Sequence, residues 1–133
     1  LNQVFMNIIS NAIDALDTFN DKRSFQEIKN NPSMIKICTS VIGEGTKENI
    51  QRVLIKIADN GPGMTPEAKK RLFDPFFTTK PVGKGTGLGL SISYQIVVEK
   101  HGGILTCESE LGKGTEFLIE IPMNQQRKIS FAK

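Results

Sequence analysis

The chain opens with residues 1–16, LNQVFMNIISNAIDAL, in which apolar side chains recur at steps of three and four residues. That spacing is typical of an amphipathic helix that buries one face in a core. Amide and carboxylate side chains fall on another side, within roughly 60° of one another around the helix axis. Since burial of such groups without a partner is costly, this row either faces solvent or faces a polar ligand. The row is Asn7, Asn11 and Asp14, and the apolar stripe is Val4, Phe5, Ile8, Ile9, Ala12, Ala15 and Leu16.

Length and composition indicate one globular domain. The chain has 133 residues, of which 38% are hydrophobic and 23% charged, as in an ordinary protein with a core. A net charge of +3 is too small to indicate nucleic-acid or membrane binding, and no apolar run approaches the roughly 20 residues that span a bilayer. The chain begins with Leu1 directly at its first helix, without a signal peptide. We therefore expect a fragment of a longer protein, with a domain over 1–122 and a polar tail over 123–133.

The two cysteines give a further expectation. Cys38 and Cys107 lie in different strand-like segments and do not have the spacing of metal ligands. We expect two reduced, buried thiols, as in a cytosolic protein. A disulfide between them is the alternative, and nothing in the sequence supports it.

Periodicity and turn residues predict the remaining elements. Alternating apolar residues predict two strands that form a hairpin, and two more strands near the end of the chain. Thr65 followed by Pro66 is typical of a helix start, and Gly102-Gly103 of a helix end. The pattern indicates an α/β sandwich, a mixed, largely antiparallel sheet with helices on one face. We expect helices at 1–16, 65–72 and 88–101, a short helical turn around 24–28, and strands at 34–42, 52–58, 104–109 and 116–122.

A glycine-rich run, GKGTGLG at 83–89, leads directly into the long helix at 88–101. Glycines let a backbone approach an oxyanion closely, and a helix start offers unpaired N–H groups, so the run is a candidate phosphate cradle. It does not match the P-loop or the dinucleotide-binding pattern, and the signatures of eukaryotic-type protein kinases are absent. By itself, the run is equally compatible with a flexible loop.

Five motifs follow one another: NxxxNAxDA in the first helix, then DNGPGM, FDPFFTTK, GKGTGLGLS and GKGTEF. In this order they resemble the ATP-binding catalytic domain of sensor histidine kinases. That family belongs to the superfamily of DNA gyrase, heat-shock chaperone, histidine kinase and mismatch-repair ATPases. The resemblance covers residues 1 to about 122 and implies the two-layer, Bergerat-type α/β sandwich. The family usually has one more strand before the first helix, which we expect to be cut off here.

The resemblance implies that ATP and Mg²⁺ are the cofactors. Asn11 matches the magnesium ligand, and its amide oxygen is a hard donor that suits this ion. Asn7, one turn earlier, is expected to contact the metal or the phosphates. Many kinases have a basic residue where this chain has Asp14, which we expect to support Asn11 or to bind solvent.

The resemblance also places the two ends of the nucleotide. Asp59 matches the carboxylate that reads adenine, since an ionised carboxylate only accepts hydrogen bonds. Gly61 and Gly63 let the backbone pass close to the base, and Thr115 matches a position beside it. The segment from Met64 to Gly87 matches the ATP lid, in which Phe73, Phe76 and Phe77 are expected to pack rather than touch the ligand. The positions that match phosphate-binding residues are Lys80, Lys84, Gly85, Thr86, Gly87, Leu88 and Gly89.

Asn7 separates this chain from part of the superfamily. In the gyrase, chaperone and mismatch-repair branches, a glutamate at this position activates water, and an asparagine cannot act as that base. We therefore expect a domain that transfers the γ-phosphate to histidine rather than hydrolysing ATP rapidly. The alternatives are an ATP-hydrolysing conformational module, a degenerate nucleotide-binding module and, as a closer rival, a serine kinase of the anti-sigma-factor type.

The expected partners lie outside this chain. His101, the only histidine, ends a helix and is expected to be structural. The family carries its phosphoacceptor histidine on a separate helical dimerisation domain, so we do not expect this fragment to autophosphorylate alone. The resemblance implies a homodimeric full-length protein, an indirect connection to a response regulator, no nucleic-acid partner, and a cytoplasmic domain whether or not the parent protein is membrane-anchored.

Overall fold

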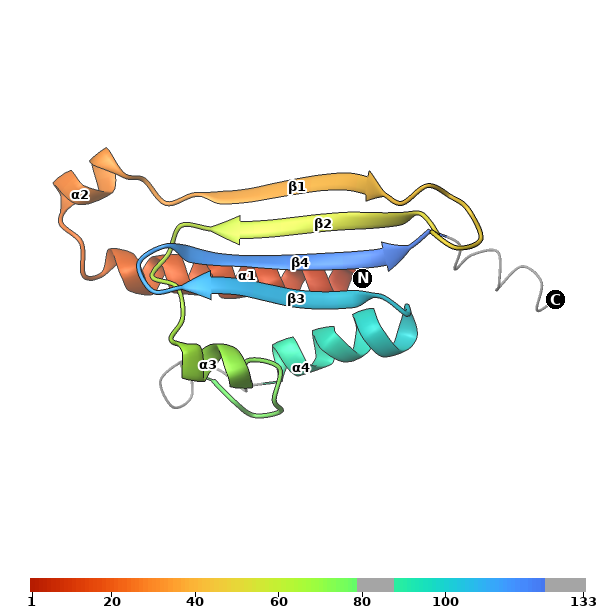
Figure 1. The fold of residues 1–133 in the computed structure, drawn as a ribbon. Helices are drawn as coiled ribbons and strands as arrows, with labels where there is room; N and C mark the ends of the chain where they lie inside the picture. Colours follow the sequence, from red (N-terminus) through yellow and green to blue (C-terminus); the bar gives the residue numbers. More distant parts are fainter. Residues whose placement is uncertain (79–87, 124–133) are drawn as a thin grey trace.

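The computed structural model describes residues 1–78 and 88–123, which form a sheet with helices packed against it (Figure 1). Four strands make the sheet, in the order β1-β2-β4-β3, and every neighbouring pair is antiparallel. The predicted two-layer α/β arrangement is confirmed, and the described strands contain no parallel pair. The elements are α1 (Asn2–Asn20), α2 (Phe25–Asn30), β1 (Ile35–Ile42), β2 (Arg52–Asp59), α3 (Pro66–Arg71), α4 (Gly89–Tyr94), the π-helix η1 (Gln95–Lys100), β3 (Ile104–Glu110) and β4 (Gly114–Pro122).

The core lies between the sheet and helix α1. Side chains alternate along the strands, so that Ile57, Phe117 and Leu105 face the helices and are buried. The predicted apolar stripe of α1 meets them, with Val4 and Ile8 almost completely buried. Helices α3 and α4 cover the β3 side of the same face, whereas α2 projects near the start of β1 (Figure 1). The stripe on α1 therefore sets which side of this helix faces away from the core.

Strand β1 is the edge of the sheet, and it corrects the expectation for the cysteines. Cys38 is exposed and Cys107 is half-buried, and both are free thiols. The prediction of two buried thiols was wrong because Cys38 lies on the face of the edge strand that points away from the helices. Even on the other face of this strand, Ile37 and Val41 stay 53% and 57% exposed, since α1 packs mainly under β2 and β4.

Helix ends follow local capping chemistry. Helix α1 continues to Asn20, four residues beyond its predicted end at Leu16, because Arg23 packs over the Phe19 ring and bonds to Asn20 at 3.1 Å. In α2 the Ser24 side chain forms a capping box with Glu27, and these hydrogen bonds lower the pKa of Glu27. Thr65 caps α3 as predicted, accepting a hydrogen bond from the Ala68 amide at 3.1 Å.

The long helix near the end of the chain changes type half-way. It begins at Gly89 as α-helix and continues from Gln95 to Lys100 as a π-helix. The wider turn is visible in the hydrogen bond from the His101 amide to the Ile96 carbonyl, at 3.1 Å. Apolar spacing did not predict it, because an α-helix and a short π-helix bury nearly the same residues. Gly102, with φ of 62°, ends the helix as predicted.

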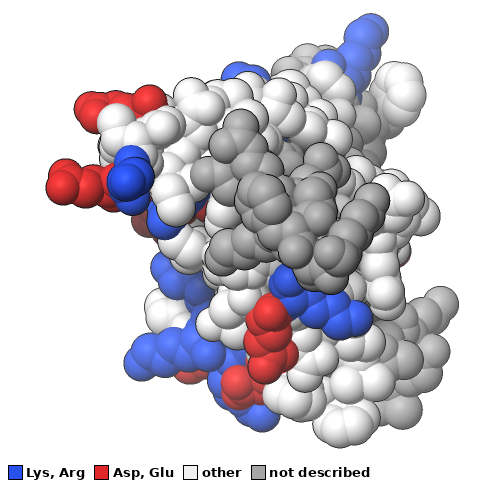
Figure 2. All heavy atoms as spheres, turned by 90° about the vertical axis from the view of Figure 1, so that its right-hand side faces the viewer, with Lys and Arg blue, Asp and Glu red and all other residues white. Residues whose placement is uncertain are grey.

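The described residues contain no helix long and apolar enough to cross a membrane. Charges of both signs lie near one another on the molecular face that Figure 2 shows.

The burial pattern of α1 predicts that alanine substitutions at two isoleucines of this helix lower the free energy of unfolding by different amounts. Ile8→Ala should lower the free energy of unfolding by about 2–5 kcal/mol, because Ile8 is 1% exposed and its removal leaves a cavity. Ile13→Ala should cost about 1 kcal/mol or less, because Ile13 is 47% exposed. Urea unfolding of both variants measures this difference, and equal losses would show that α1 presents another face to the sheet.

Candidate functional site

Asp59 ends β2 at the edge of the core, and two backbone groups hold its carboxylate. The Gly61 N–H donates to Oδ1 at 2.9 Å, and the Thr115 N–H donates to the same carboxylate. Burial raises the pKa of Asp59, and these two hydrogen bonds partly offset that effect. The side chain is thus held in place as an acceptor in a half-buried position.

The loop after Asp59 is fastened to the turn between β3 and β4. The Gly112 N–H donates to the Pro62 carbonyl at 2.8 Å, and the Met64 N–H donates to Ser109 Oγ at 2.8 Å. On its other side, the Asn60 side chain bonds to the segment before β1, at 2.8 and 2.9 Å. The predicted base-binding loop is therefore anchored by one segment that precedes it in the chain and by one that follows it.

Glycines in this region are required by close backbone packing. A Cβ on Gly61 would lie 2.9 Å from Asp59 Oδ1 and crowd the carboxylate. A Cβ on Gly63 would overlap the Glu110 carbonyl, and one on Gly114 would overlap the Asp59 carbonyl. The expectation was that Gly63 approaches the base, whereas its tightest contact is with the chain itself.

Asn7, Asn11 and Asp14 are all half-buried on α1. Asn7 contacts the start of α4, where its Nδ2 donates to the Gly89 carbonyl at 3.0 Å and to Ser93 Oγ at 3.1 Å. Asn11 and Asp14 follow toward the other end of the helix. The row is thus neither fully exposed nor sealed in the core.

Helix α1 contacts both predicted ends of the ligand site. Its second half contacts Gly61, because a Cβ there would meet Leu16 and Ala15 at 3.6 and 3.8 Å. Its first half contacts Gly89 through Asn7. With a rise of 1.5 Å per residue, these two contacts lie about 12 Å apart along the helix. That spacing suits an extended ligand with chemically different ends.

Part of the predicted phosphate-binding set lies within the described residues. Gly89 begins α4, and the Leu88 carbonyl accepts hydrogen bonds from the Ile92 N–H and Ser91 Oγ, both at 2.9 Å. The other predicted members, Lys80, Lys84, Gly85, Thr86 and Gly87, lie outside the described residues.

The sequence interpretation missed Ser109. This hydroxyl receives the Met64 N–H, lies 3.1 Å from the Gly114 carbonyl, and lies 2.8 Å from Thr115 Oγ1. It therefore connects the loop after Asp59 with the residue predicted beside the base. The signal available in the sequence was its inward position in β3, two residues after Cys107 and four after Leu105.

Comparison with known proteins shows the family to which this chain belongs. The sequence model of the family described as histidine kinase-, DNA gyrase B-, and HSP90-like ATPase matches residues 1–125. The chain belongs to this family. Sporulation kinase E of Bacillus subtilis (strain 168) is 40% identical over 125 residues, which are 94% of this chain and 14% of that protein. Sensor histidine kinase ZraS of Klebsiella oxytoca is 36% identical over 128 residues, or 96% of this chain and 23% of ZraS.

Within this ATPase family, the chain is similar to solved structures of ThkA and ShkA. The nucleotide-free catalytic domain of histidine kinase ThkA has a TM-score of 0.63 and 33% identity, covering 90% of this chain and 64% of that one. Full-length ShkA in complex with AMPPNP has a TM-score of 0.66 and 30% identity, covering 90% of this chain and 20% of ShkA. These matches confirm the predicted fold and the resemblance to the ATP-binding domain of sensor histidine kinases.

The phenylalanines predicted to pack in this ATPase domain differ in exposure. Phe73 packs against the core, with its ring 5.2 Å from that of Tyr94. Phe77 lies under the Arg71 guanidinium, which is 4.7 Å from the ring centre. Phe76 is 74% exposed and has a φ of 66°, so it does not pack as predicted. Only two of the three are therefore packing residues in this structure.

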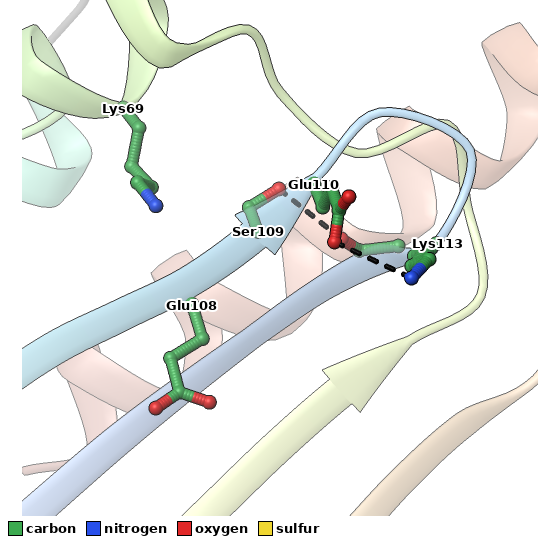
Figure 3. Close-up of a pocket in the computed structure, with 6 residues that line it drawn as sticks. Lys69, Glu108, Ser109, Glu110 and Lys113 are labelled. Atoms are coloured by element: carbon green, nitrogen blue, oxygen red, sulfur yellow. Dashed lines mark hydrogen bonds and ion pairs between the residues drawn. The ribbon is translucent and has the colours of Figure 1, made fainter.

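A pocket of about 290 Å³ is lined by the end of β3, the β3–β4 turn and Lys69 of α3 (Figure 3). Lys69 reaches toward it from α3, while Glu110 and Lys113 form an exposed ion pair at 3.5 Å. Glu108 adds a second carboxylate, so positive and negative charges balance and the pocket favours neither anions nor cations. It contains none of the predicted ligand residues.

Alanine substitutions at two glycines of the β3–β4 turn should lower the stability by different amounts, because only one of these glycines packs against Asp59. Gly112 and Gly114 have φ values of 82° and 91°, but a Cβ on Gly112 meets nothing within 4 Å. Gly112→Ala should therefore lower the free energy of unfolding by only about 1 kcal/mol, the cost of placing alanine in the left-handed conformation. Gly114→Ala should cost at least about twice as much, because its methyl group overlaps the Asp59 carbonyl. Denaturant unfolding measures both, and a Gly114→Ala loss no larger than that of Gly112→Ala would contradict the packing described.

Proposed function

We propose that this domain binds Mg-ATP along α1 and donates the γ-phosphate to a histidine on a separate helical dimerisation domain. The observation that carries this proposal is the double contact of α1, with the Asp59–Gly61 loop near one end and Gly89 near the other. The names of its relatives, a sporulation kinase and a sensor histidine kinase, and the AMPPNP complex of ShkA support it. In the parent protein, we propose a cytoplasmic position, a homodimer and a response regulator as the final acceptor.

Asp59 would select the base. Its carboxylate accepts hydrogen bonds and, when ionised, donates none. Adenine offers an exocyclic amino group as a donor, whereas guanine has a carbonyl at the equivalent position. The N–H groups of Gly61 and Thr115 bond to the carboxylate and fix its orientation. The lone pairs that these two bonds leave unused can accept a hydrogen bond from a base. The site therefore favours ATP over GTP.

The amide oxygens on α1 fit magnesium. Mg²⁺ prefers oxygen ligands and keeps several waters, so it needs few protein donors. Within residues 1–78 and 88–123, no cluster of three or more histidine, cysteine, aspartate or glutamate side chains is placed to hold a metal. A neutral oxygen from Asn11, with Asn7 one turn away, suits an ion that is shared with phosphates. When bound, Mg²⁺ neutralises phosphate charge.

The rest of the chemistry is positioning. An imidazole nitrogen of the partner domain forms the new bond to the γ-phosphorus, while the bond to the β–γ bridging oxygen breaks and ADP leaves. Asn7 supplies no general base for water, in contrast to a glutamate at this position. The domain therefore holds the phosphate chain for an external nucleophile.

A radiolabelled transfer assay tests this function. The 133-residue chain is mixed with Mg²⁺, γ-labelled ATP and a supplied helical domain of a related sensor histidine kinase that carries its acceptor histidine. We expect acid-labile label on the helical domain and none when that histidine is replaced by alanine. Acid-stable label would indicate a serine kinase, and release of free phosphate without protein label would indicate an ATPase; either result overturns the proposal.

The same assay gives the role of Asn11. Asn11→Ala should abolish transfer and reduce Mg-ATP affinity at least about tenfold in calorimetry, because it removes the proposed metal oxygen. Ile13→Ala, on the same helix but outside the polar row, is the matched control and should bind Mg-ATP like the parent chain. Unchanged Mg-ATP binding by Asn11→Ala would refute the metal assignment.

The raised pKa of Asp59 predicts opposite pH effects on binding and stability. Between the usual value of 3.8 and the raised value, the folded protein holds a proton that the unfolded chain has lost. Lowering the pH through this window should therefore stabilise the nucleotide-free protein through Asp59 and weaken ATP binding, and raising the pH should do the reverse. Calorimetry and thermal unfolding between about pH 4 and pH 7 measure both, relative to Asp59→Asn. The same pH dependence in Asp59→Asn would exclude Asp59 as its source.

A further inference from the structure

A three-membered hydrogen-bond network joins α1 to α4 beside the proposed phosphate end. Asn7 Nδ2 donates to the Gly89 carbonyl at 3.0 Å and to Ser93 Oγ at 3.1 Å. Ser93 Oγ in turn donates to the same Gly89 carbonyl at 2.8 Å. Ser93 is completely buried, with 0% of its surface exposed, so it does not touch a ligand. Its hydroxyl serves only its protein neighbours.

The network determines which end of the Asn7 amide faces α4. A backbone carbonyl accepts and never donates, so only the amide nitrogen of Asn7 is able to face Gly89. The two acceptors lie only 2.8 Å from each other, so Gly89 and Ser93 share the donor side of the Asn7 nitrogen that faces α4. If the amide were turned over, its oxygen would face the Gly89 carbonyl oxygen, and Ser93 would have to give up its hydrogen bond to Gly89 in order to donate to the Asn7 oxygen. Within residues 1–78 and 88–123, no group donates to Asn7 Oδ1.

We propose that Ser93 is a positioning residue, which together with the Gly89 carbonyl turns the Asn7 amide so that its oxygen is the end available to a bound magnesium nucleotide. This inference rests on the proposed function. It sharpens the expectation for Asn7, because an amide nitrogen held at α4 leaves the amide oxygen as an acceptor for a cation or its water. Under this proposal, Asn7 and Asn11 both offer an amide oxygen to the magnesium nucleotide.

Ser93→Ala separates positioning from folding. The change removes one hydroxyl and leaves the Asn7 amide with one partner fewer, while alanine is a better helix former than serine and limits the loss of stability. Ser91→Ala is the matched control. Ser91 lies in the same helix, is 8% exposed, and bonds through Oγ to the Leu88 carbonyl rather than to α1.

The first readout needs no nucleotide. In a ¹⁵N–¹H spectrum of the 133-residue chain, the side-chain amide signals of Asn7 should shift in Ser93→Ala, because the amide nitrogen loses one of its two acceptors. They should stay in place in Ser91→Ala. Asn7 signals that are identical in the parent chain and Ser93→Ala would overturn the network.

The second readout is the magnesium enhancement, defined as the ATP dissociation constant in EDTA divided by that in excess Mg²⁺. Ser93→Ala should reduce this ratio about threefold to tenfold, the size expected for coupled neighbours. ATP affinity in EDTA should stay within about twofold, and Ser91→Ala should change neither value. In the Asn7→Ala background, Ser93→Ala should have no further effect on the ratio, since Ser93 acts through Asn7.

The outcomes separate the two proposals. A parent chain that binds no ATP overturns the proposed function itself. A parent chain that binds Mg-ATP with a ratio unaltered by Ser93→Ala overturns only the positioning role. An effect of Ser93→Ala that persists in full without the Asn7 side chain, or an equal effect of Ser91→Ala, also overturns that role, because either points to a general change in α4.

Discussion

Helix α1 has to bury one side against the sheet and present a polar row on another. Val4 and Ile8 lie almost completely buried in the core, which fixes the rotation of the helix about its axis. With that rotation fixed, Asn7, Asn11 and Asp14 occupy the border between core and solvent. An amide in such a border position keeps polar partners on one side and access to a ligand on the other. The proposed site therefore depends on the same packing that stabilises the domain.

Two further contacts convert this helix into a site with different ends. At one end, the β3–β4 turn holds the loop after Asp59 through Ser109 and through close contacts at Gly114. At the other end, the start of α4 is tied to Asn7. Each contact is made by groups that hydrogen-bond or pack tightly, so the loop after Asp59 and the Asn7 side chain are held by described residues of the protein itself. This preorganisation is what a domain needs if its task is to hold a phosphate chain for an external nucleophile.

The fold was largely predictable, because the features that define it are local and repeated. Alternation in the β1–β2 segment predicted the hairpin, Thr65 predicted the start of α3, and Gly102 the end of the long helix. The errors arose where the outcome depended on neighbours far along the chain. Cys38 lies in a strand, but on the face opposite Ile35 and Ile37, which no described helix covers. The π-helix that begins at Gln95 could not be predicted from the spacing of the apolar residues.

By itself, the sequence determined the elements, the polar row on the first helix and the family resemblance, since periodicity and short motifs are properties of neighbouring residues. Only the tertiary structure decided which polar groups meet. Asn7 and Ser93 are 86 positions apart, and Met64 and Ser109 are 45 apart, so no local pattern connects them. Their hydrogen bonds exist because the register of β3 and β4 and the packing of α4 on α1 bring those atoms within reach. Hydrogen bonds act over about 3 Å, and only the folded chain sets distances on that scale.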